Sequence, residues 1–173
     1  MMQQQKVYSF LKNLNIQYQL YEHEPIFTVE DGNIYWANIE ATHCKNLFFR
    51  DKKGKQHYLV VLRSDKQLDI KQLNSNLTGD NERLSFASPE RLMRHLQLTP
   101  GSVSPFGLIN DEQNHVILFI DSDLKKAEKL SFHPNINTFS LVISGSDFQL
   151  FLQNIGNKHQ YIRIENAINN LIA

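Results

Sequence analysis

Two apolar segments on either side of a charged turn constrain this fold more than any other part of the chain. Residues 46–50 (NLFFR) and 57–62 (HYLVVL) each have strand length, and the second is rich in β-branched residues. Between them, residues 51–55 (DKKGK) are charged, and Gly54 suits a tight corner. The pattern predicts a β-hairpin, and therefore a sheet at the centre of the fold.

Shorter segments around this hairpin alternate between helical and strand periodicity. Thr28 with Asp31 resembles a capping box, and Ser88 before Pro89 is a strong helix start. Helices are expected around residues 7–14, from 29, 69–77, 89–96, 121–127, from 146 and 168–172, and further strands at 18–22, 85–87, 116–120, 139–143 and 161–164. Because the regular strand–helix rhythm of a doubly wound sheet is missing, we expect one α+β (mixed α/β) domain over residues 1–173, with a mixed sheet flanked by short helices.

Composition limits the classes of function. The formal net charge of the 173 residues is zero, so a basic surface for long nucleic acid is not expected and any such contact must be local. Cys44 is the single cysteine, which rules out an intrachain disulfide and fits a reducing compartment. The N-terminus lacks a secretory apolar region, and the apolar runs are too short to span a bilayer. We therefore expect a cytoplasmic protein with no membrane partner.

Several common catalytic motifs are missing from the sequence. It contains no Cys-x-x-Cys, His-Glu-x-x-His, phosphate-binding or nucleotide-binding glycine motif, and no Gly-x-Ser-x-Gly elbow. The seven histidines are scattered along the chain, so neither a metal nor another cofactor is expected. His43 and Cys44 are adjacent, and neighbouring strand residues point to opposite faces, so they would not pair readily as base and nucleophile.

Three other features are candidates for a site. Residues 101–111 (GSVSPFGLIND) combine glycine, proline and hydroxyl side chains, a pattern that suits a stiff loop offering backbone N–H groups to an oxygen, although such runs are also ordinary surface loops. Lys45 precedes an apolar strand, where it could meet a carbonyl or phosphate or could simply extend to solvent. His133 precedes Pro134, which favours an extended backbone, and its ring could enter a cleft or serve a structural role.

Read together, six segments resemble the prolyl-tRNA editing family, which comprises the editing insertion domain of bacterial prolyl-tRNA synthetase and free-standing deacylases of YbaK or ProX type. The segments are EHEPIFTVE (22–30), HCKNLFFRD (43–51), YLVVL (58–62), LSFASPERL (84–92), the loop at 101–110 and FHPN (132–135). They occur in the family's order and cover roughly residues 20–152, and no synthetase core accompanies them. The region 32–38 (GNIYWAN) departs from the Glu/Ala-rich helix expected there.

The resemblance implies a fold of this editing type and hydrolysis of the ester that joins a wrong amino acid, alanine, to tRNA(Pro). Lys45 matches the family's functional lysine, with Asn46 as its support. Gly101 and Pro105 match a Gly-x-x-x-Pro loop that shapes the amino-acid pocket together with Ser102, Val103 and Ser104. His133 matches a histidine that lines the pocket. The attacking water would be positioned by the ribose 2′-hydroxyl, so no protein nucleophile, metal or other cofactor is required.

The implied partner is the acceptor end of tRNA(Pro), with prolyl-tRNA synthetase as a second candidate. The candidates for phosphate contact are Lys52, Lys53, Lys55, Arg91 and Arg94, each of which could equally be an ordinary solvated side chain. Two alternatives stay open: a cysteinyl-tRNA(Pro) deacylase of the same fold, and a non-catalytic module that binds tRNA or an aminoacyl ligand. The oligomeric state is not predicted.

Overall fold

The predicted hairpin is present in the computed structural model, which describes residues 2–71, 73–74 and 83–166. It joins β2 (Thr42–Arg50) to β3 (His57–Arg63) in antiparallel register, with Lys45 opposite Leu62 and Arg50 opposite His57. Gly54 in the turn has a φ of +67°, which residues with a side chain rarely adopt. The first strand begins at Thr42, earlier than the predicted residue 46, so the whole HCKN segment lies in the sheet.

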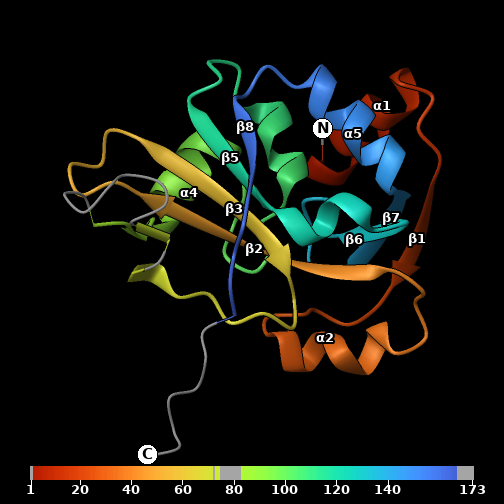
Figure 1. The fold of residues 1–173 in the computed structure, drawn as a ribbon. Coiled ribbons are helices and arrows are strands. Elements are labelled where there is room, and N and C mark those ends of the chain that lie inside the picture. Colours follow the sequence, from red (N-terminus) through yellow and green to blue (C-terminus); the bar gives the residue numbers. More distant parts are fainter. Residues whose placement is uncertain (1, 72, 75–82, 167–173) are drawn as a thin grey trace, which may run out of the picture.

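The hairpin lies at the centre of an eight-stranded mixed sheet with the order β1-β7-β6-β2-β3-β5-β8, and β4 pairs with β2 beside that path (Figure 1). The pairs β2–β6, β3–β5 and β5–β8 are parallel, and the other pairs are antiparallel. The remaining strands are β1 (Tyr18–Glu22), β4 (Ser85–Phe86), β5 (Val116–Asp121), β6 (Lys129–Phe132), β7 (Phe139–Ser144) and β8 (His159–Ile162).

Both faces of the central strand are buried. In β3, Leu59 and Val61 belong to the larger apolar core, whereas Val60 and Leu62 belong to a second, smaller one. This follows from the alternation of side chains along a strand, and it explains why residues 57–62 read as a continuous apolar run. The chain therefore forms a single α+β domain, as predicted.

Short helices flank the sheet. They are α1 (Gln3–Asn13), α2 (Val29–Trp36), α4 (Pro89–Leu96) and α5 (Gly145–Asn154), with the 3₁₀ helices η1 (Pro105–Asn110) and η2 (Ser122–Lys126). Helices α2, α4, α5 and η2 begin within one residue of the predicted positions, whereas α1 begins four residues earlier than predicted and η1 was not predicted. Thr28 forms the full capping box with Asp31, and the Ser88 hydroxyl caps α4. Helices α1 and α5 lie side by side (Figure 1), with the rings of Phe10 and Phe151 5.7 Å apart in an edge-to-face contact.

Further predictions need correction. Strand β6 was not predicted, because four residues that open with Lys129 carry too short an apolar pattern. The loop at 101–111 is half helical, since η1 occupies its second part, and the last strand spans His159–Ile162 rather than 161–164. Of the helix expected at 69–77, Leu77 lies outside the described residues, as does the terminal helix at 168–172. No helix in the described ranges combines the length and apolar character needed to cross a bilayer.

Candidate active site

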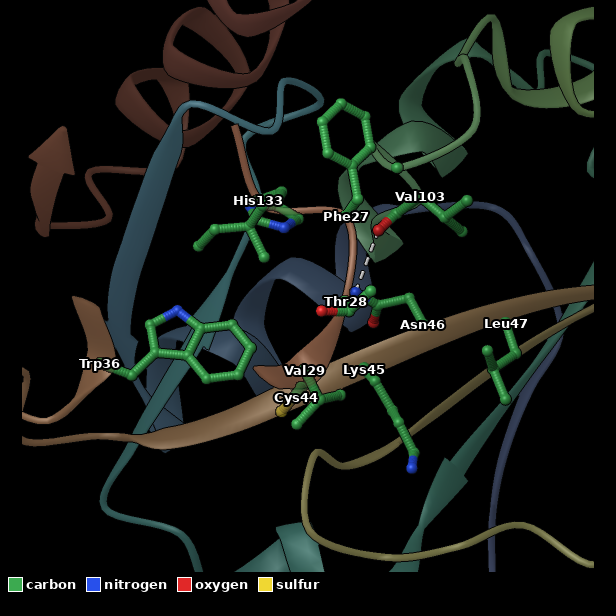
Figure 2. A pocket seen from close by; sticks show the side chains of 12 residues that line it. Phe27, Thr28, Val29, Trp36, Cys44, Lys45, Asn46, Leu47, Val103 and His133 are labelled. Carbon is green, nitrogen blue, oxygen red and sulfur yellow. Dashed lines mark hydrogen bonds between the residues drawn. The ribbon is translucent and has the colours of Figure 1, made fainter. Parts of the chain in front are cut away.

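A cavity of about 240 Å³ opens beside the start of β2 (Figure 2). Five parts of the chain form its walls: the segment 26–29, α2, the first half of β2, the glycine loop and the turn after β6. The lining residues are Ile26, Phe27, Thr28, Val29, Trp36, Cys44, Lys45, Asn46, Leu47, Gly101, Val103 and His133. The structure therefore brings Lys45, Asn46, Gly101, Val103 and His133, which the sequence placed in one site, to one cavity.

Trp36 forms a fixed wall that the sequence analysis did not assign. Its ring stacks on His43 with centroids 4.7 Å apart, and its Nε1 donates to Ser140 Oγ at 3.3 Å. The Ser140 hydroxyl in turn lies 3.0 Å from His23 Nε2. Gly32 makes room for the indole, because a Cβ there would come within 2.5 Å of it. The departure from the family pattern at 32–38 is therefore part of the pocket wall, and the single tryptophan of the chain was the available signal.

His133 presents a neutral ring to the cavity. Its Nδ1 lies 3.0 Å from the carbonyl oxygen of Phe139, to which it donates in the tautomer that this contact selects. Burial lowers the pKa of His133 below its ordinary value, and the neighbouring His23 acts in the same direction. Nε2 is then left as the acceptor of this ring.

The glycine loop contributes two residues to the wall. Gly101 has a φ of +87°, and a Cβ there would lie 3.2 Å from the ring of Phe27, so this position favours glycine both for its backbone and for its neighbour. The Val103 carbonyl accepts a 3.0 Å hydrogen bond from Asn46 Nδ2, which fastens the loop to β2. The other amide atom, Asn46 Oδ1, is buried and has no hydrogen-bond partner among the residues that the structure describes.

The remaining loop residues do not line the cavity. Ser102 and Ser104 are buried, and the Ser104 hydroxyl caps η1 by accepting from the Phe106 amide at 3.2 Å. Pro105 is buried as the first residue of η1. The expectation that these three residues touch substrate is thus not supported by their positions, which fit a role in holding Gly101 and Val103.

Lys45 extends from β2 away from His133 (Figure 2), and its Nζ donates to the backbone carbonyl of Lys66. Burial lowers the pKa of the Lys45 ammonium, while Asp65 and Glu30 oppose that shift. The twelve lining residues include no carboxylate. Lys45 is thus the one formal charge available from the lining, and reaching the middle of the cavity requires its side chain to leave the Lys66 carbonyl.

Cys44 is unsuited to nucleophilic chemistry. Burial strongly raises the pKa of its thiol, and the charge of Asp121 raises it further. A thiol held protonated in this way is inert, since the thiolate is the nucleophile.

The predicted phosphate-contact residues lie at the other end of the hairpin. The partner of Lys45 and the partner of Arg50 are five residue steps apart along β3, which corresponds to roughly 16 Å at ~3.3 Å per step. The exposed side chains in this region are those of Lys52, Lys53, Lys55 and Arg94. Arg91 is engaged instead: its Nη1 donates to the Gly54 carbonyl at 2.9 Å and lies 3.1 Å from His57 Nε2.

Comparison with known proteins agrees with this architecture. The profile of the aminoacyl-tRNA editing domain matches residues 23–151. The chain is 40% identical to the prolyl-tRNA editing protein ProX of Acetoanaerobium sticklandii over 161 residues, covering 92% of this chain and 96% of that protein. It is 32% identical to prolyl-tRNA synthetase associated domain-containing protein 1 of Bos taurus, covering 84% and 86% of the two chains.

A crystal structure described provisionally as a trans-editing enzyme for prolyl tRNA synthetase superposes with a TM-score of 0.71 at 15% identity, covering 96% of this chain and 98% of that one. At this identity the likeness establishes the fold alone. The family profile and the sequence identities define the class: this chain belongs to the aminoacyl-tRNA editing domain family, to which it is joined by its likeness to ProX.

Proposed function

We propose that the protein hydrolyses the ester of alanyl-tRNA(Pro), acting in trans on the acceptor end of tRNA released by prolyl-tRNA synthetase. The observation that carries this proposal is the cavity of about 240 Å³, which has aromatic walls, one cation and no carboxylate among its lining residues. The likeness to ProX, named as a prolyl-tRNA editing protein, supports the choice of tRNA.

Size would supply the selection. A synthetic site built for proline cannot strongly reject a smaller amino acid, because a missing methylene costs only ~1–3 kcal/mol of discrimination. The cavity is smaller than the ~300–1,000 Å³ of pockets for drug-sized ligands. Trp36 is held by stacking and a hydrogen bond, and Gly101 is held by its backbone, so the walls resist expansion. The proposal requires that the positions of these walls, rather than the total volume of the cavity, admit alanine and exclude the proline ring.

The proposed ester hydrolysis requires only three side chains of the protein. Lys45 would move from the Lys66 carbonyl to the ester carbonyl oxygen, where its charge stabilises the negative charge that develops during attack. Asn46 Oδ1, a buried acceptor without a partner, would receive a hydrogen bond from substrate, and His133 Nε2 would accept from the aminoacyl ammonium. Water oriented by the 2′-hydroxyl adds to the carbonyl carbon, the ester C–O bond breaks, and the ribose 3′-oxygen takes up a proton.

Phe27 offers a platform for the terminal adenosine. Its side chain lines the cavity, and the residue is 71% exposed, so the ring is accessible from solvent. Stacking of a base on an aromatic ring contributes ~1–3 kcal/mol per base. Phe27 would therefore hold the 3′-terminal base at the rim while the aminoacyl group enters the cavity.

The test is a single-turnover deacylation panel with alanyl-, cysteinyl- and prolyl-tRNA(Pro) at excess enzyme. We expect rapid release of alanine and sparing of the prolyl ester. Preferential release of cysteine would replace the proposal by the cysteinyl alternative. Retention of tRNA on a filter without release of any amino acid would identify a binding module instead.

A further inference from the structure

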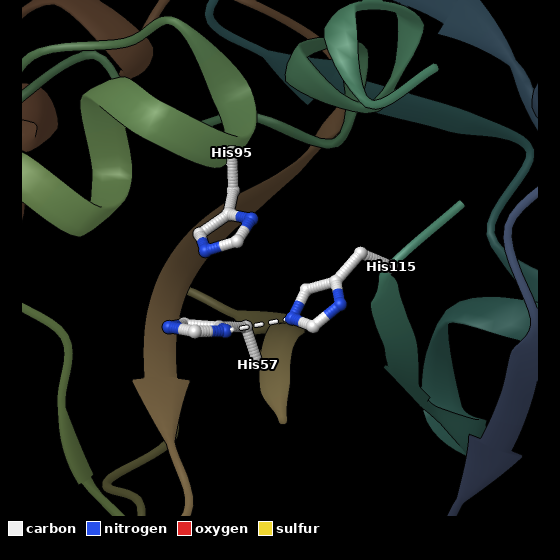
Figure 3. Close-up of side chains that lie close together, drawn as sticks. All are labelled: His57, His95 and His115. Carbon is white, nitrogen blue, oxygen red and sulfur yellow. Dashed lines mark hydrogen bonds between the residues drawn. The ribbon is translucent and has the colours of Figure 1, made fainter. Parts of the chain in front are cut away.

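Three histidines far apart in the sequence meet at the turn end of the hairpin (Figure 3). His57 opens β3, His95 lies in the last turn of α4, and His115 immediately precedes β5. One ring nitrogen from each lies within 4.8 Å of those of the other two. The seven histidines are scattered along the sequence, yet the fold brings these three together.

The spacing of these rings is close to that of a metal site. Zn²⁺ binds imidazole nitrogen at ~2.0–2.1 Å in tetrahedral geometry, so two ligand nitrogens lie roughly 3.3 Å apart. His57 Nδ1 and His115 Nε2 are already 3.0 Å apart. His95 packs against both, with ring centroids 4.1 Å from His57 and 4.7 Å from His115. A side-chain rotation of the half-buried His95 is the adjustment needed to complete a three-nitrogen set.

The backbone beneath two of the rings is already held in place. Gln56 Nε2 donates to the carbonyl of His115 at 2.7 Å and to that of His57 at 3.2 Å, bridging the two chain segments. Asp51 accepts from the amides of the hairpin turn, and Asp111 accepts from the first amide of β5. Ligands mounted on rigid elements in this way lose little freedom when an ion binds.

The surroundings of the three rings are partly apolar. The Phe48 ring stacks on His57 with centroids 5.6 Å apart and shields one side of the cluster. Imidazole ligands in such a setting suit late first-row metal ions.

We propose that His57, His95 and His115 bind one divalent metal ion of the Zn²⁺ class, which clamps the turn end of the hairpin to α4 and to the start of β5. Three imidazoles leave a fourth, open position for water. This inference is independent of the proposed function, because the cluster lies along β3 from the cavity by the roughly 16 Å derived above.

The contact between Arg91 and His57 provides a further test of the proposal. Its guanidinium is always protonated, so His57 Nε2 must accept from it, and the His57 proton then lies on Nδ1 and points to His115. An ion between His57 Nδ1 and His115 Nε2 moves that proton to Nε2, and Arg91 must then withdraw. A histidine that binds a metal ion through one ring nitrogen favours a hydrogen-bond acceptor beside the other ring nitrogen, which carries the proton. Replacing the donor by an amide that can accept, Arg91→Gln, should therefore tighten binding by about tenfold.

The experiment titrates Zn²⁺ into the full chain, free of any affinity tag and stripped by chelator, while following the melting temperature. We expect one ion per chain and a rise of roughly 5–10 °C at ~100 times the dissociation constant. Co²⁺ as a second probe should give the visible absorption of a tetrahedral site. His95→Asn and His115→Asn should abolish both signals, and Arg91→Gln should strengthen them.

The matched control is His159→Asn, which removes an exposed histidine outside the cluster and should leave both signals unchanged. Using two ligand variants keeps the test decisive if one of them fails to fold. Absence of a shift in the wild type, or a shift of equal size in both ligand variants, would overturn the proposal, because binding would then be absent or spread over other side chains.

Discussion

The two ends of the β2–β3 hairpin carry clusters of different kinds. At one end, the cavity gathers a single cation, an unpaired amide oxygen and aromatic walls. At the other end, three imidazoles lie against each other and against Arg91. The first arrangement is suited to a passing anionic, aminoacyl ligand, and the second to a small cation that stays. The two proposals thus place a reactive site and a structural clamp on one strand pair, separated along its length.

The largest expected effect on the cavity end comes from Lys45→Ala. Loss of one donor that stabilises developing negative charge typically lowers the rate by ~10²–10³. We expect a fall of that size in single-turnover deacylation of alanyl-tRNA(Pro), with little change in melting temperature, because Nζ makes a hydrogen bond to a backbone carbonyl that water can replace.

Lys126→Ala is the matched control, since Lys126 is an exposed lysine outside both the cavity and the predicted phosphate-contact residues. A near-normal rate in Lys45→Ala, or a loss fully explained by unfolding, would remove Lys45 from the site.

Gly101→Val should also act strongly, and for two reasons. The positive φ of +87° strains any residue with a side chain, at ~1–3 kcal/mol, and the added atoms meet the Phe27 ring. We expect alanine hydrolysis to fall by at least about tenfold, together with a modest fall in melting temperature. Gly101→Ala separates the two causes, because it carries the backbone strain with the smallest added volume. Unchanged activity in the valine variant would show that this loop does not shape the pocket.

A smaller effect is expected for Phe27→Ala. Loss of one stacked base corresponds to ~1–3 kcal/mol, so the affinity for alanyl-tRNA(Pro) should fall between about fivefold and a hundredfold, with less change in the rate at saturating enzyme. Met93→Ala removes another exposed apolar side chain, on α4, and serves as the control. If Phe27→Ala and Met93→Ala bound alanyl-tRNA(Pro) with equal affinity, the terminal base would not stack on Phe27.

The pH dependence of the melting temperature tests whether His133 is buried as a neutral ring. Its pKa is lowered in the folded protein by burial, so between the folded and unfolded pKa values the unfolded chain binds more protons. Stability should therefore fall as pH falls from about 6.5, the ordinary histidine value. The drop in melting temperature between pH 7.5 and 5.5 should be smaller in His133→Gln than in the wild type, while other buried histidines contribute equally to both. The same drop in both proteins would contradict this assignment.

The two clusters also differ in how far the sequence predicts them. The cavity residues lie in segments with local signals: Lys45 at the mouth of an apolar strand, Gly101 in a glycine–proline loop and His133 before a proline. The hairpin and the capped helices are likewise local patterns, and the structure confirms them. The direction of the Lys45 side chain and the roles of Trp36 and Phe27 depend on tertiary packing, which no local pattern encodes.

The histidine cluster carries no local signal at all. Its members are 38 and 20 residues apart, since they stand at positions 57, 95 and 115, and they belong to a strand, a helix and a turn. They meet because β3 and β5 pair in parallel, with His57 opposite Val116, and because α4 ends above that pair. Only the order of strands in the sheet places them together, and that order could not be deduced from the spacing of motifs.

The smallest expected effect is that of metal chelation on the deacylation rate. It distinguishes the cavity at one end of the hairpin from the histidine cluster at the other. Exhaustive chelation should leave the deacylation rate unchanged, because none of the three clustered histidines lines the cavity and the proposed chemistry uses a lysine, an amide and the substrate's own hydroxyl. The same treatment should lower the melting temperature if the protein is isolated with its ion, and added Zn²⁺ should restore it. Magnesium must be held constant with a zinc-selective chelator, since tRNA folding depends on it. Loss of turnover on chelation, with recovery on adding zinc, would mean that the metal takes part in the reaction and that the separation of the two ends is wrong.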